Sequence, residues 1–249
     1  MPEVREETEE DLVVDPRDPA KGRKVRTMFA GIAHRYDLIN RLFCAGRDQA
    51  WRARTVRMAG LEGGERVLDL CCGTGDFAVK FAKSAKAPSL VVGCDFTPEM
   101  LVLARKKAKG LNNIELAAAD ALQLPFPDRV FDVVSVGFGV RNFEKIDTGL
   151  SEIARVLKPG GRLVVLDATP GPKGLVGRLS GFYIRHLMPR LGRLVSGNPY
   201  AYSYLSNSIS AFAPAEELAA DMERAGFEQV TFSRLNFGTV AVHVGTRGG

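Results

Sequence analysis

The sequence of 249 residues lacks the features that mark membrane-spanning, secreted and metal-binding proteins. No run approaches the roughly eighteen uninterrupted apolar residues of a membrane-spanning helix, and the N-terminus lacks the basic start and apolar stretch of a secretory signal. The cysteines Cys44, Cys71, Cys72 and Cys94 do not have metal-ligand spacing, and the adjacent pair cannot bridge easily across a trans peptide bond. None of the three histidines has a metal-like partner nearby in sequence. We therefore expect a cytoplasmic protein with reduced thiols and no metal ion.

Acidic residues are unevenly distributed along the chain. Residues 1–20 carry eight acids and two bases, with few large apolar side chains, so we expect residues 1–24 to form a disordered acidic tail. Between Asp167 and Glu216 there is no acidic residue at all. The basic residues of this stretch are Lys173, Arg178, Arg185, Arg190 and Arg193.

The acid-free stretch also carries leucines at helical spacing. Apolar and basic side chains together are typical of a helix at an anionic lipid surface. A nucleic-acid surface is the competing interpretation, but the stretch lacks aromatic residues interleaved with basic ones. We expect residues 170–213 to be an insertion that faces the substrate or the membrane, and we expect no nucleic-acid partner.

From residue 25 onward the pattern predicts a single α/β domain over 25–249. Apolar residues recur at helical intervals over 25–61, which we interpret as a cap of two helices broken near Gly46. Beyond Glu65, short β-branched runs alternate with helical stretches, as in a parallel sheet with crossover helices. The predicted strands are 66–70, 90–95, 114–117, 131–136 and 162–167, and the predicted helices between and after them are 76–86, 98–109, 143–157 and 214–225.

Two further predicted strands, 228–235 and 239–246, are separated only by Asn236, Phe237 and Gly238. A connection this short permits an antiparallel hairpin and forbids a parallel crossover, so one strand at the end of the sheet should be reversed. Dinucleotide-binding sheets are parallel throughout, whereas class I methyltransferases have a reversed last strand. We therefore expect a Rossmann-like, seven-stranded sheet with helices on both faces.

A glycine turn follows the first predicted strand, in Val67-Leu-Asp-Leu-Cys-Cys-Gly-Thr-Gly75. Gly73 and Gly75 allow the backbone to turn sharply and to approach a ligand closely. With Ala78 the run also satisfies a relaxed dinucleotide pattern, so alone it does not exclude NAD. Asp69 could meet the amino group of a methionine moiety, which no dinucleotide has. The alternative for Asp69 is a carboxylate that caps a helix or a strand end.

Carboxylates also end the next two predicted strands. Asp95 can accept hydrogen bonds from both ribose hydroxyls of an adenosine. Asp120 can accept one from the adenine amino group, with Ala121 leaving room for the ring, although Asp120 could instead cap the next turn. Three acids at three successive strand ends favour S-adenosylmethionine as the cofactor. The alternatives are an NAD-dependent oxidoreductase, whose Tyr-x-x-x-Lys motif is missing, and a catalytically silent nucleotide-binding module.

Further motifs resemble those of the ubiquinone/menaquinone biosynthesis C-methyltransferases. They are Tyr36-Asp-Leu-Ile-Asn40 with Trp51 beyond it, Gly137-Phe-Gly-Val-Arg-Asn142, and Arg155-Val-Leu-Lys-Pro-Gly-Gly-Arg162. The resemblance covers about residues 25–244 and implies methyl transfer from S-adenosylmethionine to a ring carbon of a prenylated hydroquinone, either demethylmenaquinol or a ubiquinol precursor. By position, it places cofactor contacts on Thr74, Asp95, Asp120 and Ala121.

The residues after the fourth predicted strand are the candidates for catalysis. Arg141 lies at the carboxyl edge of the sheet, where its guanidinium could hold a phenolate or a water that takes the proton. Asn142 and Tyr36 could orient the ring. The alternative for Arg141 is an ion pair with a carboxylate such as Asp37.

The chain departs from the family's pattern at four positions, and these bear on the choice of substrate. Met, Ser and His are expected where Ile39, Cys44 and Asp48 stand, and Glu is expected where Asp167 stands.

Another small-molecule or lipid methyltransferase is the second interpretation of the sequence, and a nucleic-acid methyltransferase is the third. A non-catalytic S-adenosylmethionine-binding module is the alternative from a different class. Because a polyprenyl substrate must be taken from a membrane, we expect peripheral contact with the anionic inner face of the cell membrane. A homo-oligomer is also compatible with the sequence.

Overall fold

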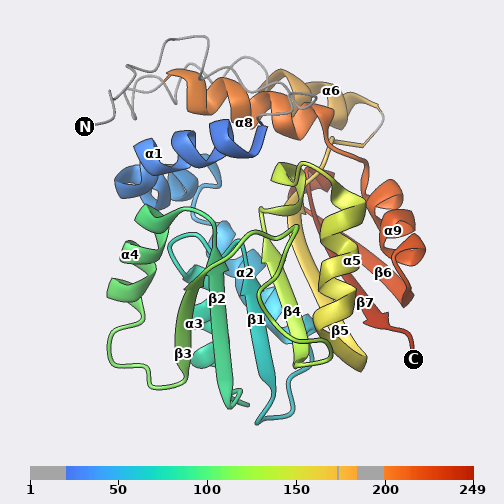
Figure 1. Cartoon of the computed structure of the whole chain (residues 1–249). Helices are drawn as coiled ribbons and strands as arrows, with labels where there is room; N and C mark the ends of the chain where they lie inside the picture. The colour runs from blue at the N-terminus through green and yellow to red at the C-terminus, as the bar shows by residue number, and fades with distance from the viewer. Residues whose placement is uncertain (1–20, 173, 184–198) are drawn as a thin grey trace.

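A seven-stranded sheet with the order β3-β2-β1-β4-β5-β7-β6 forms the centre of the computed structural model (Figure 1). The structure describes residues 21–172, 174–183 and 199–249. Its strands are β1 (Arg66–Leu70), β2 (Leu90–Asp95), β3 (Ile114–Ala118), β4 (Phe131–Gly137), β5 (Leu157–Ala168), β6 (Phe227–Leu235) and β7 (Val240–Arg247). Its helices are α1 (Lys21–Phe43), α2 (Asp48–Met58), α3 (Asp76–Ala82), α4 (Pro98–Lys107), α5 (Ile146–Val156), α6 (Leu175–Phe182), α8 (Pro199–Ala211) and α9 (Ala215–Arg224), with short 3-10 turns η2 (Val140–Asn142) and η4 (Asn236–Gly238).

The reversed strand is β7, which runs antiparallel to both β5 and β6. The hairpin turn η4 joins β6 to β7, and its residues Asn236 and Phe237 have φ of 47° and 57°, a conformation that reverses the chain within three residues. Because β1 to β5 pair in parallel, their carboxyl ends meet at one edge of the sheet. The predicted class I methyltransferase fold is confirmed.

The predicted elements agree with the structure except at their ends. The predicted helix 76–86 is too long, because α3 ends at Ala82 and the Ser84 hydroxyl donates to the carbonyls of Phe81 and Lys86, in competition with helical bonding. The predicted helix 143–157 starts too early, since Phe143 has an extended ψ of 137° and α5 begins at Ile146.

Separate apolar cores lie on the two faces of the sheet. Side chains of α5 and α9 pack on one face, with Leu150, Ile153 and Met222 fully buried. Side chains of α2 and α3 pack on the other face together with strand residues. Burying one such large apolar side chain stabilises the fold by about 1.5–3 kcal/mol. Trp51 and Val56 belong to the second of these cores, so α2, the second helix of the predicted segment 25–61, packs against the sheet.

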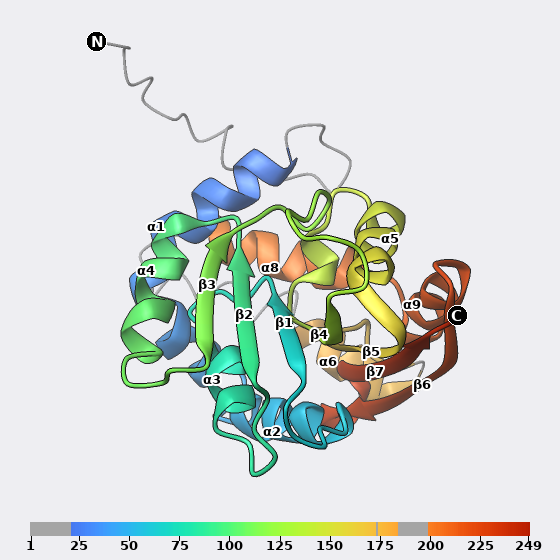
Figure 2. The same cartoon turned by 60° about the horizontal axis from the view of Figure 1, so that its bottom comes forward.

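The remaining helices α1, α6 and α8 form a layer above the carboxyl edge of the sheet (Figure 1, Figure 2). The start of α1 is fixed because the Lys21 ammonium donates to the carbonyl oxygens of Arg141 (3.3 Å) and Phe143 (2.8 Å). The backbone N–H of Gly22 donates to the Glu144 carboxylate at 2.7 Å. These contacts place residues 21–24 in a helix, so the predicted tail boundary at residue 24 is wrong. The rest of that prediction, residues 1–20, lies outside the described residues.

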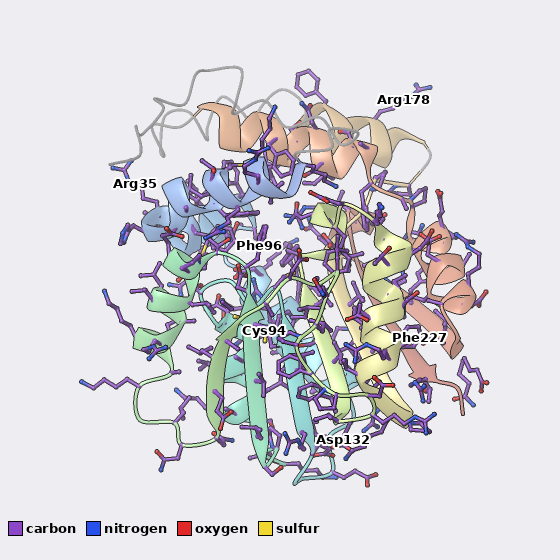
Figure 3. The ribbon with its side chains drawn as sticks, viewed as in Figure 1. Arg35, Cys94, Phe96, Asp132, Arg178 and Phe227 are labelled. Carbon is purple, nitrogen blue, oxygen red and sulfur yellow. The ribbon has the colours of Figure 1, made fainter. Side chains whose placement is uncertain are left out.

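The predicted insertion over 170–213 contains α6 and α8. Arg178 of α6 is exposed and points away from the protein (Figure 3), whereas Lys173, Arg185, Arg190 and Arg193 lie outside the described residues. Among the residues that the structure describes, no helix combines the length and apolarity needed to cross a bilayer.

Candidate active site

Two cavities lie between the carboxyl edge of the sheet and the helices above it. The first cavity has a volume of about 440 Å³ and is lined by α1 and by the segments that follow β1, β2, β3 and β4. The second cavity has about 240 Å³ and is lined by α1, α2, α8 and η4. Phe29, Tyr36 and Phe138 line both cavities, so these three side chains stand where the cavities meet.

The two predicted turn glycines have different roles. Gly73 lines the first cavity with φ of 55°, and a Cβ built there would meet only Tyr36, at 3.9 Å. A side chain at position 73 would therefore enter the cavity. Gly75 has φ of 84°, and a Cβ there would lie 3.1 Å from the Cβ of Ala104 on α4. Gly75 thus allows α3 to pack closely on α4.

Asp95, Asp120 and Ala121, which the sequence assigns to cofactor binding, all line the first cavity. The Asp95 carboxylate at the end of β2 accepts hydrogen bonds from the backbone N–H groups of Gly73 and Thr97, both at 2.9 Å. Burial raises the pKa of Asp95, and these hydrogen bonds act against that rise. Asp120 is exposed, and its carboxylate accepts the Leu122 N–H at 2.9 Å, so it lines the cavity and caps the turn at once.

These residues fit S-adenosylmethionine. The cavity volume lies in the range of small-molecule sites, about 300–1,000 Å³. Asp95 keeps lone pairs for ribose hydroxyls, Asp120 can accept from an adenine amino group, and the open backbone at Gly73 allows close approach. Phe96, directly after β2, lies beneath the α1 layer at the same edge (Figure 3).

The predicted direct contact of Asp69 with the cofactor is not supported by the geometry. Asp69 is not among the described residues that line either cavity. One carboxylate oxygen accepts the Ala78 N–H in the first turn of α3 at 2.9 Å, and the other accepts the Ser135 hydroxyl at 2.8 Å. The helix-capping alternative is the role that these contacts describe.

The stability of the protein should depend on the protonation of Asp69, because burial raises its pKa from the ordinary 3.8 to about 7. Between these two values the folded protein holds a proton that the unfolded chain releases. The resulting stabilisation is complete below the unfolded pKa and is lost as the pH rises through about 7. Relative to Asp69→Asn, which does not titrate, the wild type should lose on the order of 3 kcal/mol of unfolding free energy between pH ~5 and ~8. Urea unfolding of both proteins measures this difference, and a pH-independent difference would contradict it.

Thr74 is also turned away from the first cavity. Its hydroxyl donates to the Asp37 carboxylate at 2.6 Å and accepts from the Lys107 ammonium at 2.7 Å. Lys107 lies 2.6 Å from Asp37 and 2.5 Å from Asp76. The hydroxyl of Thr74, a residue at which the family resemblance implies a cofactor contact, belongs instead to a network that ties the glycine turn to α1 and α4.

Arg141 lines the second cavity and is held in a buried ion pair. Its guanidinium lies 2.6 Å from the Asp167 carboxylate and donates to the Phe138 carbonyl at 2.6 Å. Burial lowers and Asp167 raises the pKa of Arg141, and the balance raises it. The alternative expected for Arg141, an ion pair, is present, with Asp167 as the carboxylate and not Asp37. The Nε of Arg141 is buried without a hydrogen-bond partner among the described residues.

The other two predicted catalytic residues lie beside Arg141. Asn142 lines the first cavity, donates to the Phe138 carbonyl at 3.3 Å and accepts the Tyr204 hydroxyl at 2.9 Å. Tyr36 lines both cavities and packs edge-to-face on Phe29, with ring centroids 5.8 Å apart. The structure therefore brings Tyr36, Arg141 and Asn142 together around Phe138.

The second cavity has mostly apolar and aromatic walls with a few polar groups. Three of the four departures from the family's pattern, at Ile39, Cys44 and Asp48, line it, and the fourth, Asp167, pairs with Arg141. Burial raises the pKa of Cys44 to about 11, so its thiol stays neutral near pH 7. Arg52 also lines this cavity and was missed from the sequence, although its four-residue spacing from Asp48 places both side chains on one face of α2.

Comparison with known proteins finds relatives over most of the chain. Residues 18–247 match the ubiE/COQ5 methyltransferase family. The chain is 49% identical over 222 residues to a demethylmenaquinone methyltransferase from Thermus thermophilus, covering 88% of this chain and 100% of that protein. It is 41% identical to a ubiquinone/menaquinone biosynthesis C-methyltransferase from Desulfotalea psychrophila, covering 92% of each chain. The crystal structure of a SAM-dependent methyltransferase from Aquifex aeolicus shares the fold at 21% identity, with a TM-score of 0.58 over 84% of this chain and 96% of that one.

Proposed function

We propose, from the premise that this chain belongs to the ubiE/COQ5 methyltransferase family, that its substrate is demethylmenaquinol, a prenylated 1,4-naphthohydroquinone. The protein is an S-adenosylmethionine-dependent C-methyltransferase of quinone biosynthesis. The observation that carries the choice of substrate site is the apolar second cavity, which meets the first at Phe29, Tyr36 and Phe138. The Thermus relative is a demethylmenaquinone methyltransferase, which favours the naphthoquinol over a benzoquinol.

The protein's own side chains account for activation of the ring. S-adenosylmethionine supplies an electrophilic methyl group on its sulfonium. A ring carbon of a hydroquinone becomes strongly nucleophilic as the neighbouring hydroxyl loses its proton, and Arg141, which lines the second cavity, stabilises the resulting phenolate charge.

Orientation of the ring falls to the residues around Phe138. Tyr36 and Asn142 hold the ring at the boundary of the cavities, and the aromatic walls exclude water. Asn142 is itself held by the Tyr204 hydroxyl, so its amide keeps one orientation.

Expression in cells that lack quinone methylation tests the substrate. The expected result is methylated menaquinone in the lipid extract, identified by mass spectrometry. If only the benzoquinone precursor is methylated, the substrate is the benzoquinol and not the naphthoquinol. An extract without any methylated quinone would contradict both substrates.

We further propose that the protein takes its substrate from an anionic membrane through the surface beside the second cavity. Phe237 of η4 lines that cavity and is 75% exposed, and Leu42 near the end of α1 is 53% exposed. The Arg47 guanidinium donates to the Asn236 side chain at 3.3 Å, which brings the turn between α1 and α2 beside η4. Arg41 is exposed on α1 near Leu42. Apolar tips among basic side chains suit an anionic lipid surface.

Phe237→Ser combined with Leu42→Ser should weaken binding to phosphatidylglycerol-containing vesicles by roughly tenfold, because two apolar side chains leave the lipid. Raised salt should release part of the wild type, since screening weakens only the basic contribution. Vesicle co-sedimentation measures both effects. Val102→Ser is the matched control, because Val102 is 54% exposed on α4 and should not affect binding. Equal losses in the control and in the double variant would contradict this surface.

A further inference from the structure

The second cavity contains a buried carboxylate, Asp48, which takes no part in the proposed activation of the ring. Asp48 is the first residue of α2, and its side chain is only 3% exposed. Its Oδ2 accepts the Gln49 side-chain amide at 2.9 Å and lies 4.0 Å from the Nε of Arg52. Its Oδ1 is buried and has no hydrogen-bond partner within the part of the chain that the structure describes. A buried acceptor of this kind costs free energy until a donor reaches it.

Arg52 presents the complementary group beside it. Its side chain is 8% exposed, and its Nε likewise is buried without a hydrogen-bond partner among the described residues, at 4.0 Å from Asp48 and 3.9 Å from Asp76. Its guanidinium lies 5.4 Å from the centre of the Phe138 ring, and that of Arg141 lies 5.8 Å from the same ring. The polar part of the cavity therefore has two cationic donors around one aromatic ring, with one anionic acceptor.

Donors and acceptors distinguish the two redox forms of the substrate. Guanidinium groups only donate hydrogen bonds, so Arg52 and Arg141 can each bind a ring oxygen of either form. A carboxylate only accepts hydrogen bonds, so Asp48 needs a hydroxyl. A hydroquinone has two hydroxyls on opposite ring carbons, whereas a quinone has two carbonyl oxygens and no donor.

We propose that Asp48, paired with Arg52, selects the hydroquinone over the quinone by accepting a hydrogen bond from the ring hydroxyl opposite the one at Arg141. The inference rests on the proposed function, because it takes the ring to occupy the second cavity with one oxygen at Arg141. A bound quinone would leave Oδ1 of Asp48 facing a carbonyl oxygen, with both acceptors buried and unpaired. Since the quinone ring carbon is not nucleophilic, this selection prevents a dead-end complex.

Trp51 allows the selection to be measured as binding, without turnover. It is the only tryptophan in the sequence and it lines the second cavity, so its fluorescence reports occupancy there. The probes are a short-chain 2-prenyl-1,4-naphthoquinone in air and the same compound reduced under anaerobic conditions. The wild type should bind the quinone at least about tenfold more weakly than the hydroquinone. Asp48→Asn should reduce this ratio to about threefold or less, mainly through tighter quinone binding, because the amide can donate to a carbonyl.

Asp76→Asn is the matched control. Asp76 lies as close to Arg52 as Asp48 does and also accepts from Gln49, at 3.2 Å, but it is not among the described residues that line the second cavity. The ratio of quinone to hydroquinone dissociation constants in Asp76→Asn should equal that of the wild type.

Equal affinities of the wild type for the two redox forms, or an unchanged ratio in folded Asp48→Asn, would overturn the role of Asp48. If Asp48→Asn does not fold, the wild-type ratio decides alone. If neither redox form quenches the fluorescence of Trp51, no ring binds in the second cavity, and the proposed function fails together with the role of Asp48. Equal quenching by both forms would overturn only the role of Asp48, so the two failures are distinguishable.

Discussion

Replacing Arg141 with alanine is expected to lower the single-turnover rate of methyl transfer about a hundredfold and to leave the affinity for S-adenosylmethionine nearly unchanged. Arg141 lines the second cavity, and its guanidinium is a cationic donor of the kind that stabilises a developing phenolate. It is not among the described residues that line the first cavity, so the cofactor should bind normally. Rapid-quench transfer from labelled cofactor gives the rate, and calorimetry on the same preparation gives the affinity.

Arg141 also supports the fold, and the two roles must be separated. Removing one partner of a buried ion pair leaves Asp167 charged and unpaired, which costs about 3–5 kcal/mol of stability. Arg141→Lys keeps a positive charge for Asp167 but loses the planar fork, so it should regain much of the stability and little of the rate. If Arg141→Lys regains the rate in proportion to the stability, then the arginine is only a structural partner of Asp167.

Asp95→Ala should weaken binding of S-adenosylmethionine by about a hundredfold or more, because two hydrogen bonds to ribose are lost. Each hydrogen bond from a ribose hydroxyl to the carboxylate contributes about 1.5–3 kcal/mol, and alanine replaces neither. The variant also frees the N–H groups of Gly73 and Thr97, which shape the same wall of the first cavity. Calorimetric titration of the folded variant measures the loss.

A second aspartate separates binding from general loss of stability in that experiment. Asp132 of β4 accepts the backbone N–H of Arg66 at 2.9 Å and lies at the opposite edge of the sheet (Figure 3). Asp132→Ala should therefore cost stability without any loss of affinity. An Asp95→Ala variant that binds the cofactor like the Asp132→Ala protein would remove Asp95 from the site.

The sequence predicted those features that depend on local chemistry. The turn of only three residues at 236–238 was enough to predict the reversed strand, because no crossover fits such a length. Asp95 and Asp120 were expected at one edge of the sheet and both line the first cavity, since parallel strands bring their carboxyl ends to one edge whatever the side-chain packing.

Features that depend on side-chain direction could not be predicted in the same way. Asp69 and Thr74 belong to the segment around the glycine turn that lines the first cavity. Their side chains, however, hydrogen-bond to Ala78 and Asp37 and do not line the cavity. The partner of Arg141 is 26 residues away on β5, and only the pairing of β4 with β5 brings Asp167 close. The role of α2 in the second cavity likewise depends on its packing against the sheet, which the helical period does not specify.

The proposed function is methylation of the reduced ring of a prenylated naphthoquinol held between the two cavities. The most direct test is a single-turnover reaction of purified protein, labelled S-adenosylmethionine and a short-chain demethylated naphthoquinol under anaerobic, reducing conditions, followed by mass spectrometry of the ring. The expected result is one labelled methyl group on a ring carbon, formed with the hydroquinone and not with the quinone. Label on a ring oxygen, or no transfer by folded protein that binds the cofactor, would contradict it.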